Sequence, residues 1–171
     1  MPGQEGVAGL RIGRLAPDDW PLARSLRLAA LAADPEGFGG SYARDAALTG
    51  QQWRDDVERD LWMVARDQDG TPAGLAVLYP HDTFPDGAPQ LGSMWVAPQW
   101  RGRGVARRLV TTITAEARRL GADALGLWVT AGNEQARGVY AKLGFHLTGA
   151  MKPAPRDPAV AMHRMLRRID P

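Results

Sequence analysis

The segment with the clearest chemical character is Gln99–Ala106 (QWRGRGVA), which joins an apolar stretch directly to a helical pattern. Gly102 and Gly104 let the backbone curl and come close to a ligand. The first N–H groups of a helix have no partner within it, and the helix dipole favours an anion beside them. Arginines on the same turn supply charge-assisted hydrogen bonds: Arg101, Arg103 and Arg107. The segment therefore predicts a phosphate-binding turn; the alternative is an ordinary glycine-rich connection.

Two common phosphate loops do not fit this segment. The dinucleotide-binding fingerprint needs a third glycine where Arg107 stands, and it follows the first strand of a strand–helix–strand unit rather than a late one. The ATP-binding loop needs Gly-Lys-Ser or Gly-Lys-Thr, and the sequence contains neither triplet. The ligand is therefore expected to be a phosphate compound of another class.

The elements that would position the turn follow from hydrophobic periodicity. Strands are predicted over 10–15, 61–66, 73–79, 91–97, 124–130, 145–150 and 159–166. Helices are predicted from a cap at Asp18 or Asp19 to residue 33, from a capping box at Thr49, over 105–120 and from a cap at Asn133 to residue 143. Loops are expected at 36–48, at 80–90 and, rich in proline, between the last two strands. Hairpins mixed with strand–helix–strand units indicate a mixed sheet with helices on its faces.

From Leu91 to Phe145 the chain resembles the GCN5-related N-acetyltransferases (GNAT). The first family motif reads Arg101-x-x-Gly104-x-Ala106. The second reads Asn133-x-x-Ala136-x-x-x-Tyr140-x-Lys142-x-Gly144-Phe145. The resemblance implies the family's α/β (α+β) fold, a central mixed seven-stranded sheet flanked by helices, as a single domain over 10–168 after a frayed start at 1–9. The stretch 34–53 is the least family-like and is expected to carry substrate recognition.

The resemblance also implies acetyl-CoA as cosubstrate, with the diphosphate on the amides of 101–107 and the pantetheine arm along Trp95 and Val96. The Val96 amide would hydrogen-bond the thioester oxygen. The expected CoA-binding residues are Trp95, Val96, Arg101, Gly102, Arg103, Gly104, Val105, Ala106, Arg107, Asn133, Ala136 and Tyr140.

Tyr140 is the expected catalytic acid. It lies seven residues after Asn133, two turns along one helix face. In the family a tyrosine at this place protonates the leaving thiolate; the alternative is a core aromatic with a satisfied hydroxyl. Asn133 is expected to anchor the cosubstrate arm, to cap the helix, or both.

The residue that removes the amine proton is not evident, because the strand at 91–97 lacks the carboxylate that many relatives carry there. A water relay or the loop residues His81 and Asp82 are candidates, although a surface role is preferred for these two side chains, and Glu134 is read as complementing the helix dipole. Ser93 as an acylated nucleophile is not expected, because it lacks a paired histidine. Direct attack of an amine on bound acetyl-CoA is the expected mechanism. The acceptor is expected to be an amine of a small molecule or of a protein.

Composition excludes several other classes. The sequence has no cysteine, which rules out disulfides, cysteine zinc sites and a cysteine nucleophile, and its three isolated histidines lack metal-ligand spacing, so no metal is expected. No stretch has the length of a membrane span and the start lacks signal-peptide features, so we expect a cytoplasmic protein without membrane contact. A homodimer is common in similar proteins.

Two other functions are weighed against acetyl transfer. A catalytically silent CoA-binding or regulatory module is one, motivated by the missing strand carboxylate. A nucleic-acid-binding domain is the other, supported only by the arginines near residue 101. Nucleic acid needs a longer basic stripe with interleaved aromatics, and the net charge is only +2, so no nucleic-acid partner is expected. For Arg108, Arg118 and Arg119 a solvated helix face is preferred.

Overall fold

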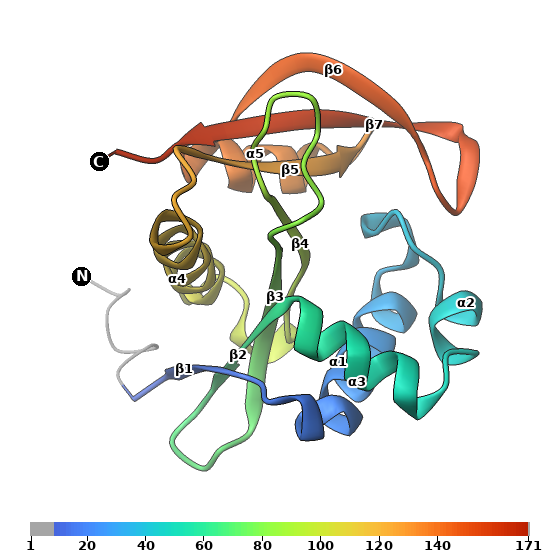
Figure 1. Ribbon diagram of the computed structural model, residues 1–171, viewed down its shortest axis with the longest axis vertical. Coiled ribbons are helices and arrows are strands. Elements are labelled where there is room, and N and C mark those ends of the chain that lie inside the picture. Colours follow the sequence, from blue (N-terminus) through green and yellow to red (C-terminus); the bar gives the residue numbers. More distant parts are fainter. Residues whose placement is uncertain (1–8, 171) are drawn as a thin grey trace.

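The computed structural model describes residues 9–170, so the predicted frayed start lies outside the described residues except for Gly9. One seven-stranded sheet runs through the molecule (Figure 1). Its order is β1 (Arg11–Arg14), β2 (Leu61–Arg66), β3 (Pro72–Tyr79), β4 (Gln90–Val96), β5 (Ala124–Thr130), β7 (Asp157–Arg168) and β6 (His146–Ala154). Only β4 and β5 pair in parallel. The predicted mixed sheet and its seven strands are confirmed.

Helices cover both faces of the sheet (Figure 1). Helix α4 (Val105–Arg119) lies on one face, whereas α1 (Trp20–Ala33) and α3 (Gly50–Arg59) lie on the other. The remaining helices are α2 (Tyr42–Ala46) and α5 (Glu134–Lys142), with short 3-10 turns at Pro17–Asp19, Pro35–Gly37 and Pro98–Trp100. Among the helices of residues 9–170, none has the length and apolarity needed to cross a membrane.

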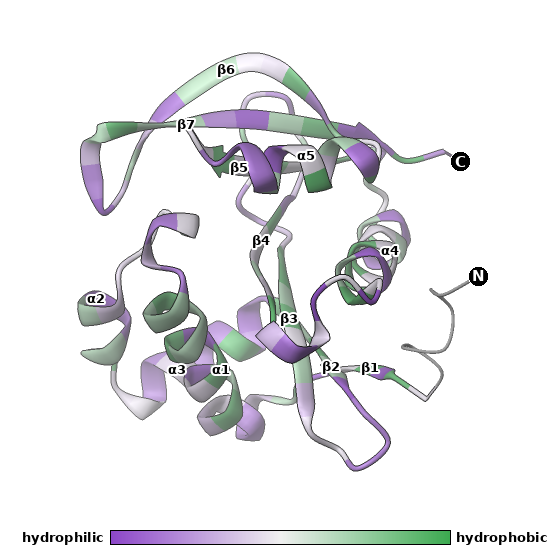
Figure 2. Ribbon diagram, turned by 180° about the vertical axis from the view of Figure 1, so that it is seen from behind, coloured by the Kyte–Doolittle hydropathy of each residue, from purple (hydrophilic) through white to green (hydrophobic). Residues whose placement is uncertain are grey.

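The central strands are apolar on both faces because each face is buried. In β2, Leu61 and Met63 belong to the core beneath α4, while Trp62 and Val64 belong to the core beneath α1 and α3. Successive side chains of a strand point to opposite faces, so a strand covered twice becomes a continuous hydrophobic run. Figure 2 shows this run along β3 and mixed colouring on the outer strands β6 and β7.

Two details differ from the sequence prediction. The predicted loop at 36–48 contains α2, which Ser41 caps by accepting a hydrogen bond from the Arg44 amide at 3.3 Å. The expected proline-rich loop is mostly strand, because β6 extends to Ala154 and β7 begins at Asp157. Proline is tolerated there because β6 is the edge of the sheet, where a missing N–H breaks no ladder.

The predicted helix caps were right in two cases and wrong in one. Thr49 and Gln52 form the capping box of α3, with the Thr49 amide donating to Oε1 of Gln52 at 2.8 Å and the Gln52 amide donating to Oγ1 of Thr49 at 3.2 Å. Oδ1 of Asn133 accepts the first-turn amide of α5. Asp19, however, accepts the amide of Ala16 at 2.8 Å and leaves α1 without a side-chain cap, because a 3-10 turn precedes that helix.

Candidate active site

Strands β4 and β5 separate and leave a cavity between them. They pair at a single position, Gln90 with Gly126, and then diverge. The cavity has a volume of about 480 Å³ and is closed by the turn before α4, by α5 and by the segment after α1. Eleven of the twelve predicted CoA-binding residues line it: Trp95, Val96, Arg101, Gly102, Gly104, Val105, Ala106, Arg107, Asn133, Ala136 and Tyr140. Residues far apart in sequence are thus brought to one site.

The Val96 peptide faces the opening between the two strands. The amide of Ala97 donates to the carbonyl oxygen of Ala73 in β3 at 2.9 Å. Successive peptide groups of a strand point to alternate edges, so the Val96 amide and carbonyl point away from β3. The carbonyl indeed accepts Nε of Arg101 at 3.0 Å. This leaves the Val96 amide as the main-chain donor on the β5 side.

The glycine turn presents the start of α4 to the cavity. Gly102 and Gly104 have φ of 71° and 81°, and a Cβ added at either would meet no atom within 4 Å. The glycines are therefore needed for their left-handed backbone and not for lack of space. The first α-helical hydrogen bond runs from the Arg108 amide to the carbonyl of Gly104 at 3.2 Å. The amides of residues 105–107 thus have no partner within the helix and suit an anion.

The arginines of the turn have different roles. Arg107 lines the cavity, and Arg101 lines it while holding the Val96 carbonyl. Arg103 lies outside the lining, with its guanidinium over the Trp100 ring at 5.6 Å from the ring centroid. Fewer arginine side chains than the sequence motif suggested are therefore available to an anion in the cavity. The main-chain amides at the start of α4 are correspondingly more important as donors.

Tyr140 stands at the α5 side of the cavity with a free hydroxyl. Its ring contacts Phe145 edge to face, with centroids 5.9 Å apart. Within residues 9–170 the hydroxyl has no hydrogen-bond partner. Burial raises the pKa of Tyr140 to about 12, so the phenol keeps its proton at neutral pH. Tyr140 is therefore not a core tyrosine whose hydroxyl already has a hydrogen-bond partner. Its hydroxyl is a potential proton donor at the cavity.

Asn133 begins α5 and uses its side-chain oxygen as a cap. Oδ1 accepts the amide of Ala136 at 3.1 Å, which fixes the side chain at the cavity wall. Its Nδ2 group makes no hydrogen bond to the described residues. The two predicted roles are thus compatible, because capping uses the oxygen and leaves two N–H donors.

The residues suggested as proton acceptors lie elsewhere. His81 and Asp82 are exposed in the loop between β3 and β4, and Glu134 pairs with Arg137 on the surface of α5. Asp34, at the end of α1, is the one carboxylate among the described residues that line the cavity. The sequence interpretation missed it because it reads as the stop of a helix before proline.

Apolar walls complete the cavity, and among the aromatic residues in them Trp95 is an expected CoA-binding residue. Phe38 enters from the segment between α1 and α2, and Trp128 enters from β5, where it meets Phe84 edge to face at 5.0 Å. Nε1 of Trp95 is buried without a partner among residues 9–170. Phe38 and Trp128 stand outside the two family motifs, so the motifs alone did not place them at the cavity.

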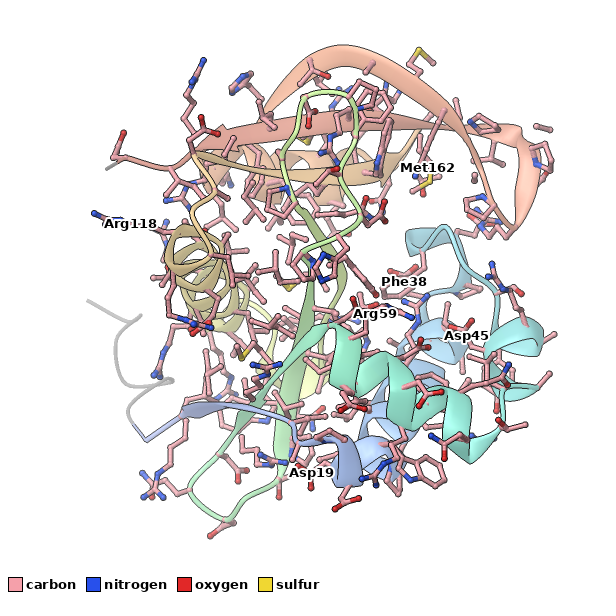
Figure 3. All side chains as sticks on the ribbon, viewed as in Figure 1. Asp19, Phe38, Asp45, Arg59, Arg118 and Met162 are labelled. Carbon is pink, nitrogen blue, oxygen red and sulfur yellow. The ribbon has the colours of Figure 1, made fainter. Side chains whose placement is uncertain are left out.

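A second cavity of about 570 Å³ lies on the α1–α3 side of the sheet. Figure 3 shows Phe38, Asp45 and Arg59 around this part of the molecule. Asp60 is 2% exposed there; burial raises its pKa, although Arg59 donates to it at 2.6 Å and opposes that effect. Trp53 also borders this cavity but is 2% exposed, so it is a core residue.

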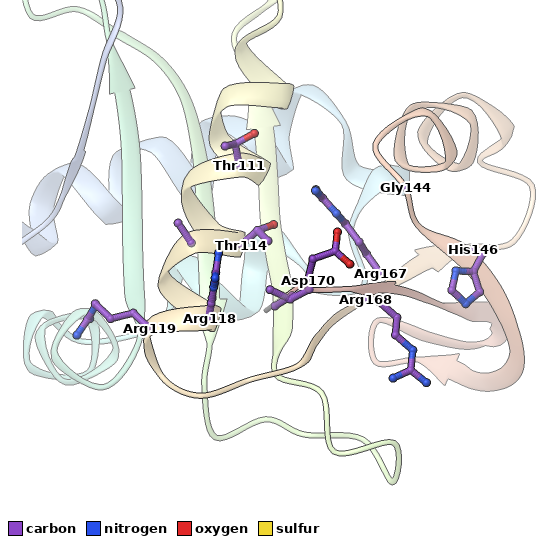
Figure 4. A pocket seen from close by; sticks show the side chains of 11 residues that line it. Thr111, Thr114, Arg118, Arg119, Gly144, His146, Arg167, Arg168 and Asp170 are labelled. Atoms are coloured by element: carbon purple, nitrogen blue, oxygen red, sulfur yellow. The ribbon is translucent and has the colours of Figure 1, made fainter.

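A cavity of about 790 Å³, larger than the one between β4 and β5, is basic and lies at the other end of α4 (Figure 4). It is bordered by Arg118, Arg119, His146, Arg167 and Arg168 and by none of the predicted CoA-binding residues. The C-terminal end of a helix presents carbonyl oxygens and not amides, so it lacks the anion-binding backbone of the glycine turn. Size therefore does not identify the site; the chemistry of the donors does.

Comparisons with known proteins agree with this geometry. The chain is 32% identical over 156 residues to a mycothiol acetyltransferase of Propionibacterium freudenreichii, covering 88% of this chain and 48% of that protein. It is 34% identical over 95 residues to an uncharacterised N-acetyltransferase of Bacillus subtilis, covering 56% of this chain and 60% of that protein. The chain thus spans only about half to three fifths of the length of these two relatives.

A solved structure shares almost the whole fold. A GCN5-related N-acetyltransferase from Kribbella flavida superposes with a TM-score of 0.71 at 26% identity, over 94% of this chain and 98% of that one. The model of the acetyltransferase (GNAT) family matches residues 26–145, which is most of the chain and includes both motifs around the cavity. With a family match of this extent, a shared fold and the motif residues gathered in one cavity, the chain belongs to the acetyltransferase (GNAT) family.

Proposed function

We propose that this protein transfers the acetyl group of acetyl-CoA to an amine by direct attack. The observation that carries the proposal is the joining, in one cavity, of three kinds of donor from different elements. These are the first-turn amides of α4, the outward amide of Val96 and the hydroxyl of Tyr140. A diphosphate, a thioester oxygen and a leaving sulfur need donors of these kinds.

The described residues fit acetyl-CoA. The left-handed Gly104 turns the first amides of α4 toward a common point, and Arg107 adds a cation. The gap beyond Gln90 leaves the β5-side edge of β4 unpaired, so an extended pantetheine arm can bind there as an added strand would. The Nδ2 group of Asn133 is a further donor on the opposite wall.

Bound acetyl-CoA would supply the thioester that an amine attacks directly. The Val96 amide donates a hydrogen bond to the carbonyl oxygen as negative charge develops on it. Tyr140 holds its proton until the sulfur leaves and then donates that proton. Phe38, Trp95 and Trp128 exclude water from the reacting atoms. Asp34, the carboxylate in the cavity lining, is the proposed acceptor of the amine proton, directly or through water.

The acceptor is proposed to be an amine of a small molecule or of a protein. One relative is named a mycothiol acetyltransferase, but the chain spans only 48% of that protein, so the acceptor does not transfer with the similarity. The second cavity, beside the segment that the family motifs do not cover, is the proposed acceptor side.

Two measurements test this proposal. Titration calorimetry with CoA should show one site, and free-thiol detection with acetyl-CoA and a panel of primary amines should show turnover for at least one amine. Binding of CoA without thiol release from any amine would instead support a silent CoA-binding module. No heat of CoA binding would remove the basis of both functions.

A further inference from the structure

Ser93 has an unusual backbone at the place where β4 leaves β5. Its φ is +50°, the only positive φ of a non-glycine residue among residues 9–170. Leu75 pairs with Trp95 whereas Val77 pairs with Gly92, so β4 holds one residue more than β3 over this interval. Such a bulge bends the strand and re-aims the residues that follow it. A serine in this region is strained and persists only when its surroundings hold it.

The surroundings hold Ser93 through its hydroxyl. Oγ of Ser93 lies 2.8 Å from the hydroxyl of Tyr79 and accepts Nη1 of Arg27 at 3.2 Å. Nε of Arg27 donates to Asp45 at 2.9 Å, and the guanidinium lies over the Phe38 ring at 5.1 Å. The bulge is therefore bound to β3, to α1 and, through Arg27, to the segment that borders the acceptor side.

Two glycines leave the space that these partners occupy. A Cβ at Gly92 would lie 2.7 Å from the Tyr79 ring, and a Cβ at Gly40 would lie 2.7 Å from Nη2 of Arg27. Neither glycine has a positive φ, so the requirement is steric. Any larger residue at either position would displace one of the two groups that bind Ser93. The contacts to Ser93 thus depend on at least four other positions of the chain, and not on the rotamer of a single side chain.

We propose that Ser93, held by Tyr79 and Arg27, is a positioning residue that fixes the β4 bulge and so sets the direction of the Val96 amide. This inference rests on the proposed function, since that amide is assigned to the thioester oxygen. The amides proposed to bind the diphosphate, those of residues 105–107, follow Arg101 in the chain and take no part in the Ser93 contacts. Loss of the Ser93 contacts should therefore slow the transfer step and leave CoA binding largely unchanged.

The kinetic test uses S93A, S93G and Y79F in the full chain. We expect kcat at saturating acetyl-CoA and amine to fall on the order of tenfold to hundredfold, because small misplacements of reacting groups have effects of this size. The Kd of CoA should change by less than about threefold, since an interaction made mainly in the transition state affects kcat and not ground-state binding. The double variant Y79F/S93A should be no slower than S93A, because both substitutions remove one shared contact.

S93G separates the hydroxyl from the backbone. Glycine adopts a positive φ without strain, so S93G keeps the bulge accessible but loses both hydrogen bonds. We expect it to be as slow as S93A. The inference is wrong if S93G retains the wild-type rate, or if Y79F and S93A do. The control is S25A, which removes a hydroxyl from an exposed serine of α1 outside these contacts and should leave the rate unchanged.

A second readout does not depend on activity. Amide hydrogen exchange of residues 90–97 without CoA should be faster in S93A and Y79F than in wild type and S25A, because the bulge loses the hydrogen bonds that hold it. Unchanged exchange would overturn the inference. If wild type binds CoA but acetylates no amine, the proposed function fails while the exchange comparison still decides this question. If S93A does not fold, Y79F, whose ring can still lie over Gly92, carries the test.

Discussion

The turn before α4 and the segment between α1 and α3 both border the proposed reaction site, but they are built in opposite ways. The turn uses main-chain amides, and its glycines are required by φ alone. The α1–α3 segment uses side chains, such as Arg27, Phe38 and Asp45, joined by ion pairs and ring contacts. A site built from main-chain amides requires a particular local backbone and therefore a local sequence motif. A site built from side chains depends on which residues, distant in sequence, come together in the fold. The cosubstrate side is therefore readable from sequence and the acceptor side is not.

The largest expected effect is on kcat and comes from substitution of Tyr140, on the cosubstrate side. In Y140F we expect kcat to fall about a hundredfold or more, because the general acid is removed from the leaving sulfur. The Kd of CoA should remain near the wild-type value, since the ring keeps its contact with Phe145. Steady-state thiol release and calorimetry measure the two quantities. A kcat within twofold of wild type would exclude Tyr140 as the acid.

The next largest effect is expected on CoA affinity, and it distinguishes a glycine in the turn before α4 from a glycine that follows the helix. G104A and G121A place an alanine at φ of 81° and 86°, each in open space. Both should lower the free energy of unfolding by a similar amount, about 1–2 kcal/mol, as a left-handed alanine requires.

Only G104A should weaken CoA binding, by about tenfold, because a strain of that size would redirect the amides. Calorimetry and denaturant unfolding measure both quantities. Equal CoA affinities of G104A and G121A would contradict a main-chain grip on the diphosphate.

A smaller effect is expected from the cap of α3. T49A removes the hydroxyl that accepts the Gln52 amide and should cost about 1 kcal/mol of unfolding free energy. Since α3 borders the acceptor side, CoA affinity should stay unchanged while the KM of the amine rises modestly. Urea unfolding and steady-state kinetics check this, and a loss of CoA affinity would show that the two sides are not separate.

The smallest expected effect concerns Asp60. Burial raises the pKa of its carboxyl above the ordinary value, against the opposing effect of Arg59. The folded state therefore binds this proton at higher pH than the unfolded state, so the contribution of Asp60 to stability falls as pH rises from the unfolded to the folded pKa. The thermal midpoint of wild type should therefore fall relative to that of D60N as the pH rises from about 4 to 7. A constant difference would exclude a raised pKa at this position.

Much of the fold was predictable because its signals are local. Alternating or continuous apolar runs marked all seven strands, and Thr49-x-x-Gln52 marked a helix start. Helix α2 was missed because its five residues follow a glycine-rich stretch and have no long periodic pattern. The extent of β6 and β7 was missed because proline reads as a loop residue until the strand is known to lie at an edge.

The sequence by itself determined the family motifs, the glycine turn before α4 and the place of Tyr140 on α5, because each depends on residues close together in the chain. Only the tertiary structure decided that Arg101 holds Val96, that Arg103 turns to Trp100, and that Asp34 lines the cavity. It alone also brought Arg27 to Ser93, 66 residues away. Contacts of that kind follow from how the helices pack on the sheet, and no local pattern encodes that packing.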